Sequence, residues 1–298
     1  QVVSSTKLNQ LLAATLGPAP TVLDPACGYG GSLVSVASQT SRVVGMDTNP
    51  EACFIASLRL AMKGVEDAGI EVRNSLLNPP QEKFDLVVCQ PPLNERLEAD
   101  QVNPAILDLI PGAGRSVSGN AAWLALVAAS VTAGGQAAIV MPPASTSNRT
   151  QLSAVRRGLL DQGRVQAVVA LPPGYILGSE SGAFLWILSG QTDPRKKGRV
   201  LMVSAAAMLA ENGARAEQVG QLVRTWAEGA VLDEVPDWVA GLVDGSELVS
   251  KGFAPQLHLA LPPVEAQSRP TPPGRLLTSL TLQNFKSVER EQTIPLRP

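Results

Sequence analysis

Short apolar runs alternate with helical patterns over the first two thirds of the chain. Buried strands are predicted at seven of these runs, which are Thr21–Asp24, Arg42–Asp47, Ile70–Arg73, Phe84–Cys89, Gln136–Met141, Val165–Leu171 and Ala183–Leu188. Helices are predicted between them, over Gly31–Ser38, Pro50–Lys63, Ala121–Val131 and Gln151–Leu160. Strands that alternate with helices favour a parallel sheet with both faces covered.

The pattern changes after this region. An apolar run over Arg199–Val203 is followed by a helical pattern that is clearest over Ala214–Ala227. Val264–Gly274 is rich in Pro, Gln, Ser and Thr, which is typical of a linker. Beyond it, Leu277–Phe285 alternates like a strand. We therefore expect a large α/β domain over residues 1–262, a linker over 263–276 and a strand-like tail over 277–298.

The most informative segment is a glycine-rich turn that follows the first predicted strand. The strand ends at Asp24, and Gly28, Gly30 and Gly31 lead into a helix. Glycines let the backbone approach a ligand and adopt positive φ, and ligands of open α/β sheets bind at the carboxyl ends of the strands. Asp24 places a negative charge in this turn, so a ligand with an amino group suits it better than a pyrophosphate.

A second acid, Asp47, closes the next strand. In nucleotide-binding folds an acid at this position accepts hydrogen bonds from ribose hydroxyls. A dinucleotide fingerprint would also require glycine at the sixth position of the turn, where this chain has Leu33. The residues therefore predict a nucleoside-containing ligand and disfavour a dinucleotide oxidoreductase.

The motif DPACGYGG at 24–31 resembles the S-adenosylmethionine motif of adenine-specific DNA methyltransferases. The segments GNAAWLALVAASVTAGGQAAIVMPP and RRGLLDQGRVQAVVALPPGYI extend this resemblance, which is greatest to the methylation subunits of type I restriction-modification systems. It implies a class I S-adenosylmethionine-dependent methyltransferase fold, with a mostly parallel seven-stranded sheet and one antiparallel strand near its edge. It further implies that S-adenosylmethionine is held by Asp24, Ala26, Gly28, Gly30, Gly31, Asp47 and Asn74.

The resemblance also assigns a catalytic loop after the fourth strand, at Gln90, Pro91, Pro92 and Leu93. In the family this loop reads Asn-Pro-Pro-Phe or Asn-Pro-Pro-Tyr; its carbonyls orient the amine of a flipped adenine and its aromatic ring stacks on the base. Gln90 keeps the amide but moves the acceptor by about 1 Å or more, which can cost on the order of 100-fold in rate. Leu93 has no aromatic face. The alternative is therefore a weakened or inactive module that binds cofactor or DNA.

The net charge of the chain bears on how it could bind DNA. Residues 1–268 hold 19 Lys and Arg against 24 Asp and Glu, a net charge of −5, so a partner is expected to supply much of any contact with DNA phosphates. Arg156-Arg157 is expected on a solvated face, with DNA contact as the alternative. Trp123, Trp186, Trp226 and Trp238 are expected in the core.

One histidine and three cysteines without a CxxC pair suggest neither a metal site nor a disulfide framework. The first residues lack the pattern of a signal peptide, and no apolar run is long enough for a membrane span, so we expect a cytoplasmic protein. DNA and a specificity or other subunit are the expected partners. The tail resembles the opening hairpin of ABC/SMC-like ATPases, which suggests a fused ATPase domain as another.

Overall fold

The computed structural model describes residues 5–147, 151–176, 182–191, 198–205, 216–229, 240–255, 259, 279–282 and 292–295. The chain divides into two compact units, Gln1–Pro262 and Pro263–Pro298. In the second unit, β12 (Ser279–Leu282) and β13 (Gln292–Pro295) pair antiparallel. The rest of the predicted linker and tail lies outside the described residues.

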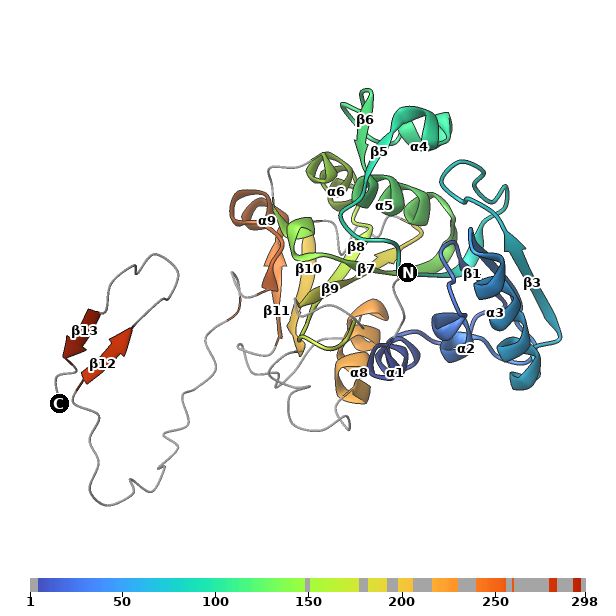
Figure 1. Ribbon diagram of the computed structural model, residues 1–298, viewed down its shortest axis with the longest axis horizontal. Coiled ribbons are helices and arrows are strands. Elements are labelled where there is room, and N and C mark those ends of the chain that lie inside the picture. Colours follow the sequence, from blue (N-terminus) through green and yellow to red (C-terminus); the bar gives the residue numbers. More distant parts are fainter. Residues whose placement is uncertain are drawn as a thin grey trace, which may run out of the picture. The chain divides into compact units, whose positions relative to one another are not determined.

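The first unit is built on a nine-stranded sheet (Figure 1). Its order is β11-β10-β8-β9-β7-β4-β1-β2-β3. The strands are β1 (Thr21–Asp24), β2 (Arg42–Asp47), β3 (Asp67–Val72), β4 (Phe84–Cys89), β7 (Val131–Met141), β8 (Val165–Leu171), β9 (Ala183–Ser189), β10 (Arg199–Ser204) and β11 (Ala240–Asp244).

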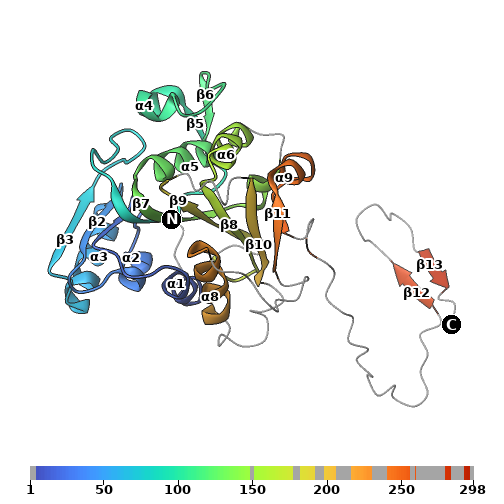
Figure 2. The ribbon, with the colours of Figure 1, turned by 180° about the vertical axis from the view of Figure 1, so that it is seen from behind.

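Helices cover both faces of this sheet, and each layer buries its own apolar core (Figures 1 and 2). One layer contains α1 (Thr6–Thr15), α2 (Gly31–Val36), α3 (Pro50–Lys63) and α8 (Ala216–Ala227). The other contains α4 (Pro104–Leu107), α5 (Gly119–Ala129), α6 (Leu152–Asp161) and α9 (Gly245–Lys251). Helix α5 is apolar all round and has ten buried residues, because it lies between the sheet and its neighbouring helices.

Local signals set the bounds of α3, which begins and ends as predicted. Asn49 caps its start by accepting the N–H groups of Glu51 and Ala52, and Pro50 occupies the first helical position. Gly64 ends the helix with a φ of 79°. The turn that connects β2 to α3 is therefore fixed, and with it the position of Asp47.

The α/β fold with a mostly parallel sheet is confirmed, but the predicted number of strands and the predicted place of the antiparallel strand are wrong. The antiparallel strand β9 lies inside the sheet, between β7 and β8, rather than near its edge. Strand β10 continues the parallel sheet beyond β8, and β11 closes it antiparallel to β10. The positions of these strands depend on pairing between segments that are distant in the chain, and an apolar run does not indicate which strand it will pair with.

The predicted boundary between α5 and the next strand is also wrong. The helix ends at Ala129 and β7 already begins at Val131, which pairs with Phe84 of β4. Gly135 lies so close to β4 that a Cβ there would be 2.6 Å from the Asp85 carbonyl oxygen. Gly135 therefore permits a close approach of two strands, at a position that was predicted to lie between the helix and the strand.

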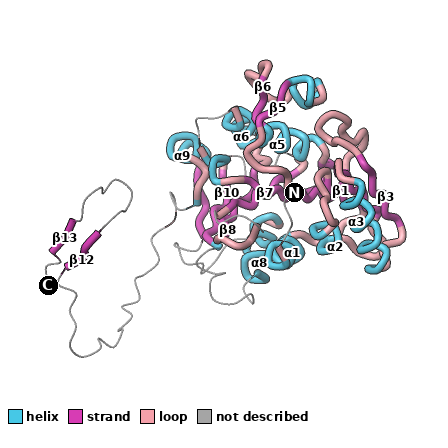
Figure 3. Tube along the Cα trace, in the orientation of Figure 1, coloured by secondary structure: helices cyan, strands magenta, loops and turns pink. Residues whose placement is uncertain are grey.

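Between β4 and α5 the chain adds a small excursion. It contains β5 (Arg96–Glu98), the short 3-10 helix Ala99–Gln101, α4 and β6 (Ser116–Ser118), and β5 pairs antiparallel with β6. Figure 3 shows β5 and β6 at the top of the first unit, beyond α5.

Candidate cofactor and target cleft

Two acids end neighbouring parallel strands, as the sequence predicts. Asp24 is the last residue of β1 and Asp47 the last of β2, and Asp24 pairs in register with Gly45. The turn between β1 and α2 passes beside both of them. The two carboxyl groups therefore meet at the edge of the sheet where ligands of this fold class bind.

The Asp47 carboxylate joins two turns. One oxygen accepts the Gly28 N–H at 2.9 Å and the other accepts the Asn49 N–H at 2.9 Å. Asp47 thus fixes the glycine turn against the start of α3. Each oxygen has a further lone pair, so the half-buried carboxylate can also accept hydrogen bonds from a ligand.

Asp24 lies deeper, with 1% of its surface exposed. Its carboxylate accepts the Ala26 N–H at 3.0 Å. Burial raises the pKa of Asp24 from 3.8 to about 7, the Ala26 hydrogen bond opposes this, and the nearby Asp47 charge adds to it. A cationic group of a ligand beside Asp24 would favour its ionised form.

The glycines of the turn have different roles. Gly28 and Gly30 adopt left-handed φ values of 49° and 75°. Gly28 lines the cleft, whereas Gly30 packs against α3, where a Cβ would lie 2.9 Å from the Ala56 Cβ. Gly31 borders a smaller cavity beside Asp24. The predicted contact of Gly30 with the cofactor therefore stays a prediction, because packing alone requires glycine there.

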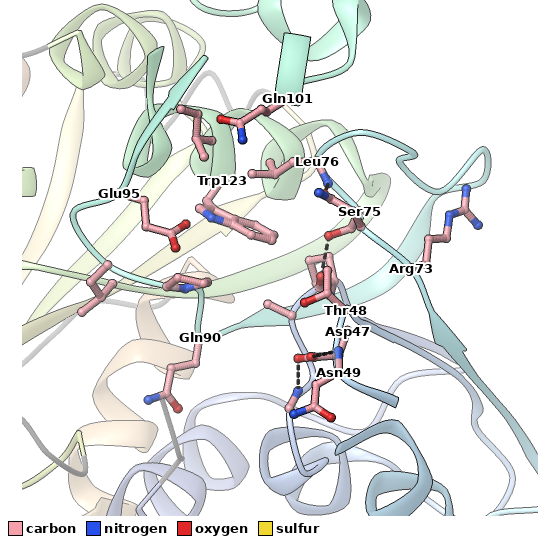
Figure 4. A pocket seen from close by; sticks show the side chains of 17 residues that line it. Asp47, Thr48, Asn49, Arg73, Ser75, Leu76, Gln90, Glu95, Gln101 and Trp123 are labelled. Carbon is pink, nitrogen blue, oxygen red and sulfur yellow. Dashed lines mark hydrogen bonds between the residues drawn. The ribbon is translucent and has the colours of Figure 1, made fainter. Parts of the chain in front are cut away.

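A cleft of about 670 Å³ opens over these residues (Figure 4). Its floor and one wall include four predicted cofactor residues, namely Ala26, Gly28, Asp47 and Asn74. A second cavity of about 100 Å³ lies beside Asp24 and shares Ala26, Gly28 and Gln90 with the cleft. The volume of the cleft lies within the range of small-molecule sites.

Asn74 follows β3 and stabilises the turn after it. Its carboxamide oxygen accepts the N–H groups of Leu76 at 3.1 Å and Leu77 at 3.2 Å. The next residue, Ser75, donates its hydroxyl to the Pro25 carbonyl at 2.5 Å, which connects this turn to the glycine turn. The carboxamide nitrogen is then the group that Asn74 can offer to a ligand in the cleft.

The predicted catalytic loop borders the same cleft. Gln90, with 6% of its surface exposed, lines both cavities, and Pro92 and Leu93 line the larger one. Pro91 is buried behind them and lines neither. Leu93 packs against the core beneath α1 and α2. The structure thus brings this loop to the cleft that four of the predicted cofactor residues line, and Gln90 lies where the cleft and the smaller cavity meet.

Sequence reasoning missed the opposite wall. Glu95, Leu97 and Gln101 of the excursion line it together with Trp123 of α5. The signal available for Glu95 was its place two residues beyond Leu93, in a loop that leaves the carboxyl end of a central strand. Trp123 was expected in the core; it is 7% exposed and also borders the cleft.

For Arg156 both the expected solvated face and the alternative of DNA contact are wrong. Arg156 has 1% of its surface exposed, donates to the carbonyls of Ser145 and Ser147, and lies 4.5 Å from the centre of the Phe253 ring. Its neighbour Arg157 is exposed.

Two of the other tryptophans are buried as predicted. Trp186 is 1% exposed, and the Trp226 indole donates to the Gln166 carbonyl at 2.8 Å. Trp238 lies outside the described residues.

In the part of the chain that the structure describes, no three His, Cys, Asp or Glu residues gather into a possible metal site, and no helix is long and apolar enough to cross a membrane.

Two curated proteins are similar to this chain in sequence. A type I restriction enzyme methylase subunit of Methanocaldococcus jannaschii, MjaVIII, is 25% identical over 229 residues, which cover 69% of this chain and 39% of that protein. A second, MjaIX, is 26% identical over 202 residues, or 62% of this chain and 36% of that protein. The chain thus spans about two fifths of the length of these curated relatives.

Among solved structures, the methyltransferase subunit of a type I restriction-modification system from Streptococcus thermophilus superimposes with a TM-score of 0.71 at 19% identity. The superposition covers 88% of this chain and 58% of that one. A putative class I S-adenosylmethionine-dependent methyltransferase from Listeria monocytogenes shares the fold, with a TM-score of 0.58 at 17% identity over 74% and 68% of the two chains. The profile of the N-6 DNA methylase family matches residues 3–251, and the chain belongs to this family.

Proposed function

We propose that this chain binds S-adenosylmethionine in the cleft and transfers its methyl group to N6 of adenine in DNA, as part of a restriction-modification system. The observation that carries the proposal is that the glycine turn, the two strand-end acids and Gln90 border the cleft and the smaller cavity beside it, which share Ala26, Gly28 and Gln90. Membership of the N-6 DNA methylase family supports the same reaction.

The residues of the cleft fit the cofactor. Asp47 would accept the ribose hydroxyls, and Asn74 would offer its amide nitrogen to the adenine ring. Asp24, buried beside the smaller cavity, would pair with the amino group. S-adenosylmethionine supplies an electrophilic methyl group: an N–C bond forms, the C–S bond breaks with its electron pair staying on sulfur, and the amine gives up one proton.

In the target loop, Gln90 and the Pro91 region would orient the amine of the base. Gln90 is one methylene longer than the family's Asn, and Leu93 cannot stack on the base. A displacement of about 1 Å costs on the order of 100-fold in rate, and base–aromatic stacking is worth roughly 1–3 kcal/mol. We therefore propose that transfer by the unaltered chain is slow.

A partner would deliver the DNA. Residues 1–268 carry a net charge of −5, which opposes unaided binding to phosphates. The curated relatives are methylase subunits of type I restriction enzymes, so a specificity subunit is the first candidate. The second candidate function, a non-catalytic module of a methyltransferase–ATPase fusion, is favoured by the Gln90 and Leu93 departures and by the tail that resembles an ATPase hairpin.

Methyl transfer from labelled S-adenosylmethionine to mixed-sequence DNA tests the reaction. The DNA is used at high concentration and digested to nucleosides, and the product is identified by mass spectrometry. We expect little N6-methyladenine from the unaltered chain. The double variant Gln90→Asn/Leu93→Phe should give more than either single change, because both act on one base.

The control variant Gln81→Asn shortens an exposed glutamine outside the cleft and should leave the rate unchanged. If the double variant binds the cofactor but gives no N6-methyladenine, the result contradicts the methyltransferase proposal and favours the non-catalytic module.

A further inference from the structure

Three residues that have no role in the function proposed above line the smaller cavity beside Asp24. Thr6 and Asn9 come from α1, and Arg59 comes from α3. Gln90 borders the same cavity and also the larger cleft. Two helices that are far apart in the chain thus bring polar side chains to the cavity that Asp24 and Gln90 share.

Asn9 contributes a buried acceptor. Its carboxamide oxygen is shielded from solvent and has no hydrogen-bond partner among the residues that the structure describes. Buried acceptors nearly always receive a hydrogen bond, so this oxygen is suited to a ligand that brings a donor. The carboxylate of Asp24, which is 1% exposed, is a second acceptor at the same cavity. An ammonium group has three N–H donors and can therefore serve both acceptors at once.

Arg59 contributes a cation to the same cavity. Its guanidinium group donates to the Tyr29 carbonyl at 2.9 Å, which attaches it to the glycine turn. Within the described part of the chain it makes no other hydrogen bond and no ion pair. A guanidinium group has five N–H donors in one plane and binds carboxylates through two parallel hydrogen bonds. Arg59 can therefore bind the turn and the carboxylate of a ligand together.

Together these groups match the head group of an α-amino acid. The acceptors of Asn9 and Asp24 suit an ammonium, the guanidinium of Arg59 suits a carboxylate, and all three residues line one cavity of about 100 Å³. S-adenosylmethionine carries such a head group at the end opposite its adenine. The larger cleft of about 670 Å³ has room for the nucleoside, which leaves the smaller cavity for the amino-acid end.

We propose that Arg59 and Asn9 bind the amino-acid end of the cofactor, with the Arg59 guanidinium paired with the α-carboxylate and the Asn9 carboxamide oxygen accepting from the ammonium beside Asp24. This inference rests on the proposed function and deepens it, because it names the residues that distinguish the zwitterionic cofactor from a nucleoside without a carboxylate. Thr6, the first residue of α1, offers its hydroxyl as a further donor to the carboxylate.

The same contacts would position the methyl group. The sulfur of the cofactor joins the nucleoside to the amino-acid end, so it would lie where the two cavities meet. Ala26, Gly28 and Gln90 line both cavities at this place. Holding the amino-acid end at Arg59 would therefore keep the methyl group beside Gln90, the first residue of the target loop.

Calorimetry of the full chain with related ligands tests the two residues separately. The ligands are S-adenosylhomocysteine, its decarboxylated analogue 5′-(3-aminopropylthio)-5′-deoxyadenosine, which keeps the amine, and 5′-methylthioadenosine, which lacks both charged groups. We expect S-adenosylhomocysteine to bind about tenfold more tightly than the decarboxylated analogue. Arg59→Gln should remove this difference by weakening S-adenosylhomocysteine alone. Asn9→Leu should weaken both ligands that carry the amine by about tenfold and leave 5′-methylthioadenosine unchanged.

The matched controls change similar side chains outside both cavities. Arg157→Gln alters an exposed arginine of α6, and Gln10→Leu alters an exposed amide of α1. Both variants should bind all the ligands as the unaltered chain does.

A purely structural effect on the glycine turn would weaken all the ligands alike, so the selectivity between them carries the test. Equal binding of S-adenosylhomocysteine and its decarboxylated analogue by the unaltered chain overturns the assignment of Arg59, and so does an Arg59→Gln variant that keeps the difference or weakens both. Unchanged binding of the amine-carrying ligands by Asn9→Leu, or weaker binding of all the ligands, overturns the assignment of Asn9. In each case binding of S-adenosylhomocysteine still supports the proposed function, whereas no binding to the unaltered chain at millimolar ligand refutes both.

Discussion

Asp24 makes the affinity for S-adenosylmethionine depend on pH in a defined way. Its carboxyl is buried and its pKa is raised to about 7. Pairing with the ligand's amino cation requires the ionised form, so below pH 7 binding must displace a proton. About one tenth of the carboxyl is ionised at pH 6, so affinity should fall about tenfold for each unit below 7, or about 1.4 kcal/mol. Above pH 7 it should level off.

Isothermal titration calorimetry between pH 5.5 and 7.5 measures this dependence. The range ends there because the ligand's own α-amino group titrates at a pKa of about 8. Repeating each titration in two buffers with different ionisation enthalpies counts the protons released. At pH 6 we expect about 0.9 proton to be released per ligand bound, since about nine tenths of the Asp24 carboxyl is then protonated.

Two controls separate Asp24 from other groups. The ligand 5′-methylthioadenosine lacks the amino group, so its affinity should change little over this range. Asp24→Asn should bind S-adenosylmethionine more weakly and without proton release. An affinity that stays constant from pH 5.5 to 7.5 in the unaltered chain would refute the pairing of Asp24 with the amino group.

Two further predictions concern packing around the site. Gly30→Ala should lower the free energy of unfolding by about 1–3 kcal/mol, because the turn requires positive φ and the new methyl group would meet Ala56. Urea denaturation measures this loss. Adding Ala56→Gly should restore only the part of the loss that comes from the clash. Arg156→Met should lower the free energy of unfolding by about 2–4 kcal/mol, since it leaves buried carbonyls such as that of Ser145 without their donor. Arg157→Met, on the exposed side of α6, should change the free energy of unfolding by less than about 0.5 kcal/mol. Equal urea midpoints for the two arginine variants would contradict the buried role of Arg156.

The parts of the site that the sequence predicts are those with local signals. The two acids follow short apolar runs directly, and the glycine turn joins one run to a helix. The bounds of α3 follow from Asn49, Pro50 and Gly64, which act within one turn of the helix. Such signals need no knowledge of distant partners.

The parts that it does not predict depend on distant segments. Strand β9 lies between β7 and β8 only because the chain returns to pair with both. Arg156 is buried because Ser145 and Phe253 surround its guanidinium group. Glu95 faces the cleft because Asn120 and Gly119 fix the backbone around it. No local sequence pattern around β9, Arg156 or Glu95 indicates these contacts.

Calorimetric titration of the full chain with S-adenosylmethionine is the decisive test of whether the cleft is a cofactor site. We expect saturable binding that Asp47→Asn weakens by about tenfold or more, because one of the carboxylate acceptors is lost. Asp67→Asn, a change of the same chemistry at the start of β3 and outside the cleft, should bind as the unaltered chain does. No binding at millimolar cofactor, or equal binding by Asp47→Asn and the unaltered chain, would contradict it.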